Sequence, residues 1–355
     1  MTEPRTDRYS WRLVEPGTPL ERVDGAARFP EAGEVVVEVA GCGVCHTDLG
    51  FIDGSVATKA GLPLVLGHEI SGRVVETGDG AGDWMGIGVL VAAVIPCGEC
   101  EMCASGRGNV CINQKMPGND LDGGFATHVT VPATGLSAID DLPAGYDLAD
   151  FSVIADAVTT PLQAVRRAEV SDGDFVVVVG TGGVGTYAVQ IAAASGATVV
   201  AVDIAEDRLD LVLGYGAAAV VNSRQLSARE VRDRVREHAV ALGMSRTGWK
   251  IFECSGTTGG QETAYGLLGP AATLAVVGFT REKVSIRLSN LMAFDATAFG
   301  SWGCPPERYP EAIALVTSGN VTLLPFTRKV PMSDIATVLE EAHHRSDPRR
   351  TILVP

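Results

Sequence analysis

Residues 175–203 read FVVVVGTGGVGTYAVQIAAASGATVVAVD, and this stretch decides the fold. It opens with a short apolar, β-branched run, passes through a glycine-rich turn and continues with helical periodicity over 184–195. A second β-branched run at 198–202 completes a strand, helix, strand unit, from which parallel sheets covered by helices are built. The stretch therefore predicts a doubly wound α/β domain.

The turn has the spacing of a dinucleotide-binding loop. It matches G-x-G-x-x-G, and its candidate cofactor-binding residues are Gly180, Gly182, Gly183, Val184 and Gly185. Glycine permits a tight turn and lets a pyrophosphate approach the amides that begin the next helix. Asp203 ends the second strand, where a carboxylate accepts hydrogen bonds from ribose hydroxyls and repels a 2′-phosphate, so NAD is favoured over NADP. Arg208 lies one turn further and either contacts that ribose or is a solvated surface residue.

The bulk composition describes a globular protein with a small-molecule partner. The 355 residues are 46% apolar, which is enough for the cores of two domains. The formal net charge of -15 repels nucleic acid and anionic lipid, so we expect neither as a partner. Residues 1–12 carry no apolar signal segment, and the apolar runs fall short of the roughly 18 residues of a membrane helix. We therefore expect a cytoplasmic protein.

The strand pattern divides the chain into three parts. Alternating, β-branched patterns occur before the glycine-rich turn, at residues 34–40, 70–76, 89–94 and 125–131. We expect a β-rich domain over 1–158 and the dinucleotide-binding domain over 159–299. Residues 300–355 contain short strands and one helix, and we expect them to return to the first domain.

Four of the eight cysteines lie close together in one loop, namely Cys97, Cys100, Cys103 and Cys111. The cytosol keeps thiols reduced, so metal binding is favoured over disulfides. Four thiolates close a tetrahedral zinc site and leave no open position, so its role is structural. Free thiols and an iron–sulfur cluster are the alternatives, the second disfavoured because nothing else in the chain indicates electron transfer.

Two further residues of the first domain have metal-ligand chemistry. Cys45 and His68 could be two ligands of an open site, although isolated cysteines usually pack as small hydrophobic residues. They belong to the motifs GVCHTD at 43–48 and GHE at 67–69. Taken in order with the four-cysteine loop, the glycine-rich turn, Asp203 and a terminal RTIL, these motifs resemble the zinc-containing medium-chain alcohol dehydrogenases over essentially the whole chain.

The resemblance implies an architecture and a set of cofactors. The expected fold is a GroES-like β-rich catalytic domain plus a Rossmann domain. The expected cofactors are NAD and two Zn²⁺ per chain, one catalytic and one structural. The expected assembly is a homodimer or homotetramer.

The resemblance also implies the ligands of the catalytic zinc. Relatives hold it with a cysteine and a histidine that match Cys45 and His68, and with a third ligand that is commonly cysteine. This chain has Asp156 at that third position, which is an acceptable zinc ligand and preserves two negative charges. Glu69 is implied as an alternate ligand or a close neighbour of the ligands, and Asp48 as the residue that orients His68.

Two catalytic residues and one more cofactor contact follow from the same resemblance. Thr47 matches the hydroxyl that relays the alcohol proton. Gly50 stands where some relatives have the histidine that ends the relay, so His46 is the replacement candidate. Arg350, from the terminal motif, is a further candidate cofactor-binding residue.

Four shorter stretches narrow the expected substrate, at residues 155–161, 252–257, 288–294 and 302–306. They resemble the 6-hydroxycyclohex-1-ene-1-carbonyl-CoA dehydrogenases of anaerobic benzoyl-CoA degradation, which oxidise a ring alcohol of an acyl-CoA to the 6-oxo compound. Three alternatives stay open: a dehydrogenase for another secondary or cyclic alcohol, a zinc-free enone or enoyl reductase on the same fold, and a non-catalytic NAD-binding scaffold.

Overall fold

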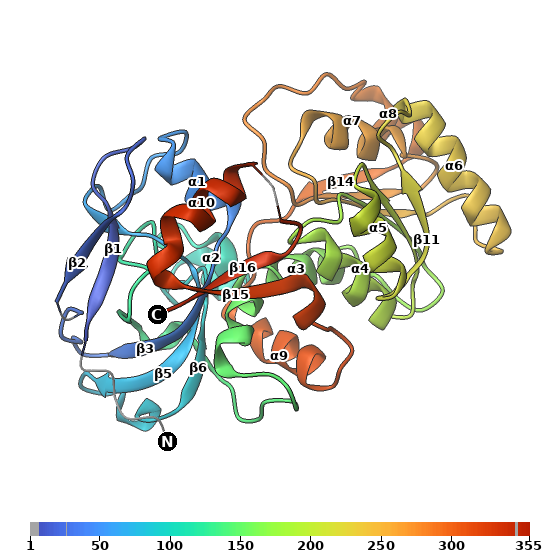
Figure 1. Ribbon diagram of the computed structural model, residues 1–355. Helices are drawn as coiled ribbons and strands as arrows, with labels where there is room; N and C mark the ends of the chain where they lie inside the picture. The colour runs from blue at the N-terminus through green and yellow to red at the C-terminus, as the bar shows by residue number, and fades with distance from the viewer. Residues whose placement is uncertain (1–6, 26, 345–346) are drawn as a thin grey trace. The chain divides into compact units, whose positions relative to one another are not determined.

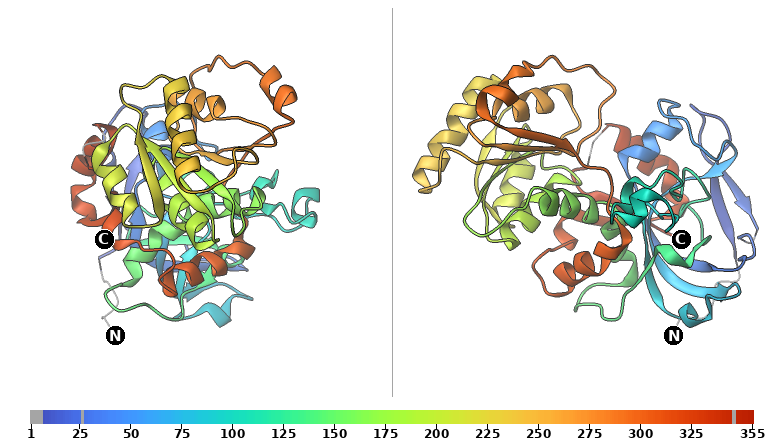
Figure 2. Two further views of the ribbon diagram at one scale, coloured as in Figure 1. Left: turned by 90° about the vertical axis from the view of Figure 1, so that its right-hand side faces the viewer. Right: turned by 180° about the vertical axis from the view of Figure 1, so that it is seen from behind.

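The computed structural model describes residues 7–25, 27–344 and 347–355. Contacts within the chain divide it into two compact units, which we describe separately. The first unit comprises Met1–Thr159, Gly303–Thr317 and Leu323–Pro355. The second comprises Thr160–Trp302 and Ser318–Thr322. Figure 1 shows the chain coloured along its length, and Figure 2 gives two further views.

The first unit contains most of the strands. They are β1 Tyr9–Leu13, β2 Glu21–Asp24, β3 Glu34–Gly43, β4 Leu64–Val65, β5 Glu69–Thr77, β6 Gly88–Val91, β7 His128–Pro132, β8 Leu136–Ala138, β15 Thr327–Pro331 and β16 Arg350–Val354. Its α-helices are α1 His46–Ile52, α2 Glu101–Ala104, α9 Tyr309–Thr317 and α10 Ile335–His344. Its 3₁₀ helices are η1 Gly82–Trp84, η2 Gly108–Val110, η3 Ala133–Gly135, η4 Leu148–Ala155, η5 Pro306–Arg308, η6 Leu324–Phe326 and η7 Met332–Asp334.

The sheets of the first unit bring distant segments together. The larger sheet has the order β15-β16-β3-β5-β6-β8, and β7 also pairs with β3. A smaller sheet has the order β2-β1-β4. Gly43 of β3 lies opposite Glu69 of β5 and also opposite Ile352 of β16. The C-terminal strand therefore lies next to the segments that carry Cys45 and His68.

The second unit is a parallel sheet with helices on both faces (Figures 1 and 2). Its strands are β9 Phe175–Val179, β10 Thr198–Asp203, β11 Ala217–Asn222, β12 Lys250–Glu253, β13 Thr273–Val276 and β14 Thr297–Gly300. Its helices are α3 Thr159–Arg167, α4 Gly185–Ala194, α5 Glu206–Leu213, α6 Ala228–Ala241, α7 Thr258–Gly266 and α8 Ser289–Phe294. The strand order in the sheet is β11-β10-β9-β12-β13-β14. Successive strands are added on one side of β9 up to β11 and on its other side from β12 onward. Doubly wound sheets bind ligands at the carboxyl ends of the strands where the order switches in this way, here β9 and β12.

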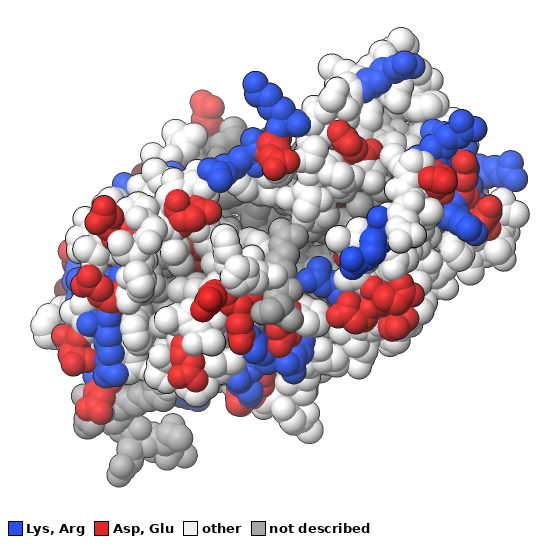
Figure 3. All heavy atoms as spheres, turned by 45° about the horizontal axis from the view of Figure 1, so that its top comes forward, with Lys and Arg blue, Asp and Glu red and all other residues white. Residues whose placement is uncertain are grey.

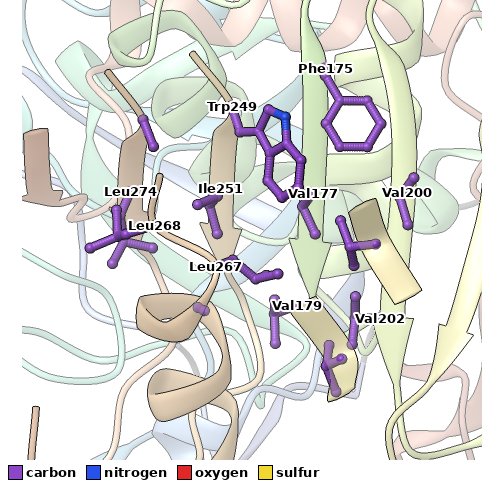
Figure 4. Packing of buried hydrophobic residues seen from close by; sticks show 14 of the residues in the cluster. Phe175, Val177, Val179, Val200, Val202, Trp249, Ile251, Leu267, Leu268 and Leu274 are labelled. Carbon is purple, nitrogen blue, oxygen red and sulfur yellow. The ribbon is translucent and has the colours of Figure 1, made fainter. Parts of the chain in front are cut away.

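A single apolar cluster fills one face of this sheet (Figure 4). Alternate residues of β9 and β10 point into the cluster, and helices α6 and α7 contribute further buried side chains to it. Trp249 lies against Phe175, with ring centroids 5.1 Å apart. The indole nitrogen of Trp249 donates to the carbonyl of Ser245 at 2.8 Å, so the buried aromatic leaves no polar atom unsatisfied.

The predicted fold class is confirmed, and the main differences concern strand ends. The run at 125–131 forms a strand only from His128, because its first residues bond to β1 instead: Trp11 donates to the carbonyl of Phe125. The run at 89–94 leaves the ladder after Val91, where the N–H of Ala92 donates to the carbonyl of Gly135. Helix α6 and the small sheet of β1, β2 and β4 were not predicted.

Figure 3 shows acidic and basic side chains interspersed over the face in view. Within residues 7–25, 27–344 and 347–355, no helix combines the length and the apolar character that crossing a membrane requires.

Candidate active site and structural metal centre

The four loop cysteines converge on one point in the first unit. Their sulfur atoms all lie within 4.8 Å of one another. The Sγ separations are 3.4 Å for Cys97–Cys111, 3.5 Å for Cys100–Cys103, 3.6 Å for Cys100–Cys111 and 4.0 Å for Cys97–Cys103. A tetrahedral zinc with bonds of about 2.3 Å holds its sulfurs about 3.8 Å apart. The four thiols therefore fit a closed, structural zinc site.

Two short helices and backbone hydrogen bonds orient these sulfur atoms toward one another. Cys100 precedes α2, and Cys111 follows η2, so two short helical turns present the cysteines from both sides. The backbone N–H groups of Cys97 and Asn113 donate to the Cys111 sulfur at 3.4 and 3.3 Å. A backbone hydrogen bond from Cys103 lowers the pKa of Cys100 to about 6. Such N–H donors stabilise thiolates, which are the form that binds zinc.

Replacing Cys100 by serine should remove this zinc and lower stability together. A closed four-thiolate site contributes its binding free energy to folding, so both effects have one cause. We expect metal content to fall from two zinc ions per chain to one, measured by elemental analysis alongside thermal unfolding. Cys254→Ser is the matched control, because Cys254 lies outside the loop and should leave two zinc ions bound. Unchanged metal content in Cys100→Ser would contradict the assignment.

A second group of metal-type residues lies elsewhere in the first unit. Ligand atoms of Cys45, His68, Glu69 and Asp156 all lie within 4.8 Å of one another. The Asp156 Oδ2 atom is 3.7 Å from the Cys45 sulfur and 3.7 Å from the His68 Nε2 atom. These separations suit one thiolate, one imidazole and one carboxylate oxygen around a common ion. The structure thus brings together four residues whose numbers span 45 to 156.

Asp48 fixes the backbone that carries the first two of these residues. Cys45 is the N-cap of α1, and the buried Asp48 side chain accepts from its backbone N–H at 2.9 Å. The other carboxylate oxygen accepts from Gly67 N–H at 3.2 Å and lies 3.4 Å from His68 Nδ1. One side chain therefore sets the spacing between the Cys45 and His68 segments.

His68 provides a test of whether a metal fits. The ring is 1% exposed, and neither nitrogen makes a hydrogen bond within the described residues. Buried polar atoms are almost always satisfied, and the carboxylates of Asp48 and Asp156 lie beyond good hydrogen-bond geometry, so these two nitrogens leave room for a metal ligand bond. Burial alone would lower the pKa of His68, but the Asp48 and Asp156 carboxylates outweigh it and raise that pKa well above its ordinary value. The surroundings are therefore built to hold positive charge.

Glu69 lies in the same group but has a partner of its own. Its buried carboxylate accepts from Arg350 Nε at 2.8 Å and also pairs with Arg350 Nη2. Burial raises the pKa of Glu69 to about 7, against the opposing effect of Arg350. Arg350 Nη2 also lies 3.7 Å from Asp156 Oδ2. Sequence reasoning assigned Arg350 to the cofactor, and missed this pairing because 281 positions separate it from Glu69.

The two candidate relay residues differ in their placement. The Thr47 hydroxyl is half-buried and lies 3.7 Å from the Cys45 sulfur. His46 is exposed, and it is not among the residues that converge on the second metal-type group. Thr47 is therefore the one of the pair that reaches the ligands.

The glycine-rich turn joins β9 to α4 in the second unit. Gly180 has φ +88°, and a Cβ there would lie 2.6 Å from Ser255 backbone atoms. A Cβ on Gly185 would lie 1.7 Å from the Gly180 carbonyl oxygen, so both positions require glycine. Gly182, Gly183 and Val184 are half-buried at the start of the helix, where amides are available to a phosphate.

Asp203 ends β10 and bonds to the same turn. One carboxylate oxygen accepts from Thr181 N–H at 2.6 Å and from the Thr181 hydroxyl at 3.0 Å. The other accepts from the backbone N–H groups of Ile204 and Ala205 at 2.7 and 3.0 Å. Arg208 is half-buried, and its Nη1 atom is 3.7 Å from where a Cβ on Gly182 would stand. Asp203 and Arg208 thus both border the turn.

Two family models match the chain in the order of its units. The model for the alcohol dehydrogenase GroES-like domain matches residues 31–141. The model for zinc-binding dehydrogenase matches residues 183–318.

Known proteins resemble the chain over nearly its whole length. An alcohol dehydrogenase from Geobacillus stearothermophilus is 32% identical over 316 residues, which cover 87% of this chain and 88% of the relative. Galactitol 1-phosphate 5-dehydrogenase from Escherichia coli is 29% identical over 94% of this chain and 98% of its own.

Solved structures agree with these matches. The crystal structure of the Escherichia coli galactitol-1-phosphate dehydrogenase superposes with a TM-score of 0.87 at 27% identity, over 98% of this chain and 100% of that one. The alcohol dehydrogenase of Aeropyrum pernix gives a TM-score of 0.86 at 28% identity, over 98% of this chain and 100% of that one. Together with the two metal-type groups, these matches identify the chain as a member of the zinc-binding alcohol dehydrogenase family, oxidoreductases that act on CH–OH groups.

Proposed function

We propose that the protein oxidises a secondary ring alcohol with NAD at the group formed by Cys45, His68 and Asp156. The observation that carries this proposal is the buried His68 ring, whose nitrogens make no hydrogen bond among the described residues and which lies beside a thiol and a carboxylate. Three ligands leave a fourth zinc position for substrate, unlike the closed four-cysteine site. We assign Gly180, Gly182, Gly183, Val184, Gly185, Asp203 and Arg208 to NAD.

Each residue of the group has a task in this reaction. When bound, zinc supplies a Lewis acid that polarises the substrate hydroxyl, and NAD accepts the hydride. Cys45, His68 and Asp156 would hold the ion, and the Cys45 thiolate and the Asp156 carboxylate would balance its charge. The half-buried Thr47 hydroxyl takes the substrate proton and passes it toward solvent. We assign the exposed His46 only to the outer end of this path.

Glu69 and Arg350 act together in this proposal. Their ion pair keeps a second carboxylate from the ligand position while leaving it near the ion. Arg350 also lies 3.7 Å from Asp156 Oδ2, so one cation balances two carboxylates. Glu69 is thus a reserve ligand that is released only if Arg350 moves.

The proposed substrate is 6-hydroxycyclohex-1-ene-1-carbonyl-CoA, with the 6-oxo compound as product. The support is the resemblance of residues 155–161, 252–257, 288–294 and 302–306 to dehydrogenases of that substrate. The test is NADH formation with this acyl-CoA against cyclohexanol and galactitol 1-phosphate. We expect kcat/KM to be at least about a hundredfold higher for the acyl-CoA, because remote binding energy contributes to turnover. Faster turnover of simple alcohols would contradict the substrate and leave the dehydrogenase assignment intact.

A polyol is the second candidate substrate. Galactitol 1-phosphate 5-dehydrogenase is 29% identical over 94% of this chain, and a sorbitol dehydrogenase of Halalkalibacterium halodurans is 30% identical over 82%. Both names describe polyols with an open carbon chain rather than a ring alcohol. The same panel of substrates separates this candidate from the acyl-CoA.

Asp203→Ala should weaken NAD binding and reduce discrimination against NADP. Loss of hydrogen bonds to a charged group corresponds to about 1.5–3 kcal/mol, or roughly 10- to 100-fold in Kd. The matched control is Asp203→Asn, which keeps an oxygen for the Thr181 N–H but removes the charge that repels a 2′-phosphate. Fluorescence titration with NADH and NADPH measures both. An unchanged ratio of the two affinities in both variants would remove Asp203 from the ribose site.

We also propose that the protein forms a homodimer or homotetramer. Strand β14 ends the sheet of the second unit, and most of its residues are exposed. Phe279, Leu288 and Met292 of the same unit are 71%, 68% and 79% exposed, which is unusual for large apolar side chains. Analytical ultracentrifugation tests this proposal, and a monomer at micromolar concentration would contradict it.

A further inference from the structure

The hydroxyl of Tyr309 lies buried against the residue that precedes Asp156. Tyr309 begins α9 and is 1% exposed. Its hydroxyl donates to the carbonyl of Ala155 at 2.6 Å and accepts from the backbone N–H of Ala93 at 2.9 Å. All of these residues belong to the first unit. One phenol therefore ties the turn that carries Asp156 to the chain that follows β6.

A second hydroxyl bonds to the same carbonyl. Thr159 Oγ1 donates to the Ala155 oxygen at 2.8 Å. Ala155 is the last residue of η4, and Asp156 follows it with φ -133° and ψ -54°, outside the helical region. Because the peptide bond is planar, fixing the Ala155 carbonyl also fixes the N and Cα atoms of Asp156. The two hydroxyls thus define where the Asp156 side chain starts.

The Asp156 carboxylate has three close neighbours. Its Oδ2 atom lies 3.7 Å from Cys45 Sγ, 3.7 Å from His68 Nε2 and 3.7 Å from Arg350 Nη2. The first two belong to the proposed ligand set, and the guanidinium pairs with the same oxygen. Aspartate has a short side chain, so the position of its backbone decides whether the carboxylate reaches Cys45 and His68.

We infer that Tyr309 is a positioning residue for the catalytic metal: its hydroxyl, together with that of Thr159, holds the Ala155–Asp156 peptide where the Asp156 carboxylate reaches Cys45 and His68. The inference rests on the proposed metal site. Tyr309 itself reaches the site only through the backbone, and 154 positions separate it from Ala155, so no local motif indicates the link. Residues that orient metal ligands typically change metal affinity by about 10- to 100-fold when they are replaced.

The test is Tyr309→Phe, which removes the hydroxyl and keeps the ring. Chelator competition on the zinc-loaded protein measures the affinity of both sites, so the four-cysteine site is an internal reference. We expect the catalytic-site Kd to rise about 10- to 100-fold while the structural-site Kd stays unchanged. Cobalt placed in the catalytic site should show a shifted visible absorption spectrum, because its ligand geometry changes. A role in packing alone would move neither measurement.

Tyr265→Phe is the matched control. Tyr265 is also buried and donates to a backbone carbonyl, that of Arg287, but it lies in the second unit. It should leave both affinities and the cobalt spectrum unchanged. A catalytic-site Kd for Tyr309→Phe within about twofold of the parent, with an unchanged spectrum, overturns the inference.

Two further outcomes are decisive. If Tyr309→Phe does not fold, Thr159→Ala removes the other donor to the Ala155 carbonyl, and parent-like metal affinity in that variant overturns the inference. If the parent protein binds only one zinc ion per chain, the proposed catalytic site fails and the inference fails with it. Two bound ions in the parent with an unaffected Tyr309→Phe variant overturn the role of Tyr309 alone.

Discussion

Asp156→Ala is expected to lose the catalytic zinc, keep the structural zinc and reduce kcat/KM by about a thousandfold. Two protein ligands, Cys45 and His68, seldom hold zinc tightly, since catalytic sites use three. Lewis-acid catalysis contributes several kcal/mol, and each 1.36 kcal/mol corresponds to a tenfold change in rate. Elemental analysis after chelator treatment, together with steady-state NADH formation, measures both effects.

Asp156→Cys is the matched control for this variant. A thiolate keeps the charge and the coordination number and restores the ligand type common among relatives. We therefore expect two zinc ions per chain and an altered but substantial turnover. Should Asp156→Ala keep two tightly bound zinc ions and its parent rate, Glu69 would have to supply the third ligand, which requires its release from Arg350.

Arg350→Met is expected to destabilise the protein by about 3–5 kcal/mol, because it leaves the buried Glu69 carboxylate without its partner. For a unit of this size, the effect corresponds to a fall of roughly 6 to 20 °C in Tm. Thermal unfolding followed by circular dichroism measures it. Methionine keeps most of the side-chain volume, so lost packing contributes little.

The double variant Glu69→Gln/Arg350→Met separates charge from packing. Replacing both partners of a buried pair is far less costly than replacing one, so we expect most of the lost stability to return. NAD affinity, titrated in parallel, tests the role assigned to Arg350 from the sequence. Unchanged Tm with a weakened NAD Kd in Arg350→Met would favour a cofactor contact over the ion pair.

The features that could be predicted from the sequence are those whose parts lie close together along the chain. The glycine-rich turn needs only one strand, one turn and one helix, and steric limits at Gly180 and Gly185 follow from local backbone geometry. The four-cysteine loop spans 97 to 111, so spacing alone predicts four sulfurs near one point. The parallel sheet followed from alternating strand and helix patterns, and this fold class is confirmed.

Strand limits and pairing partners required the tertiary structure. The run at 125–131 was predicted as one strand, but its first residues bond to β1 instead of continuing β7. Helix α6 was missed although its capping box, Ser227 with Glu230, is a readable start signal. Propensity reports what a segment can form, whereas hydrogen-bond partners depend on which segments meet.

The surroundings of the proposed catalytic ligands depend on tertiary structure. Sheet register sets Glu69 opposite Gly43 and brings the C-terminal strand beside them, so that Arg350 pairs with Glu69 across 281 positions. Tyr309 reaches Ala155 across 154 positions in the same way. No local sequence pattern predicts either contact, because a buried ion pair or a hydrogen bond from a buried hydroxyl forms only where two remote segments pack together. The sequence thus predicted which residue types would bind the metal, whereas the fold determined which residues orient these side chains and balance their charge.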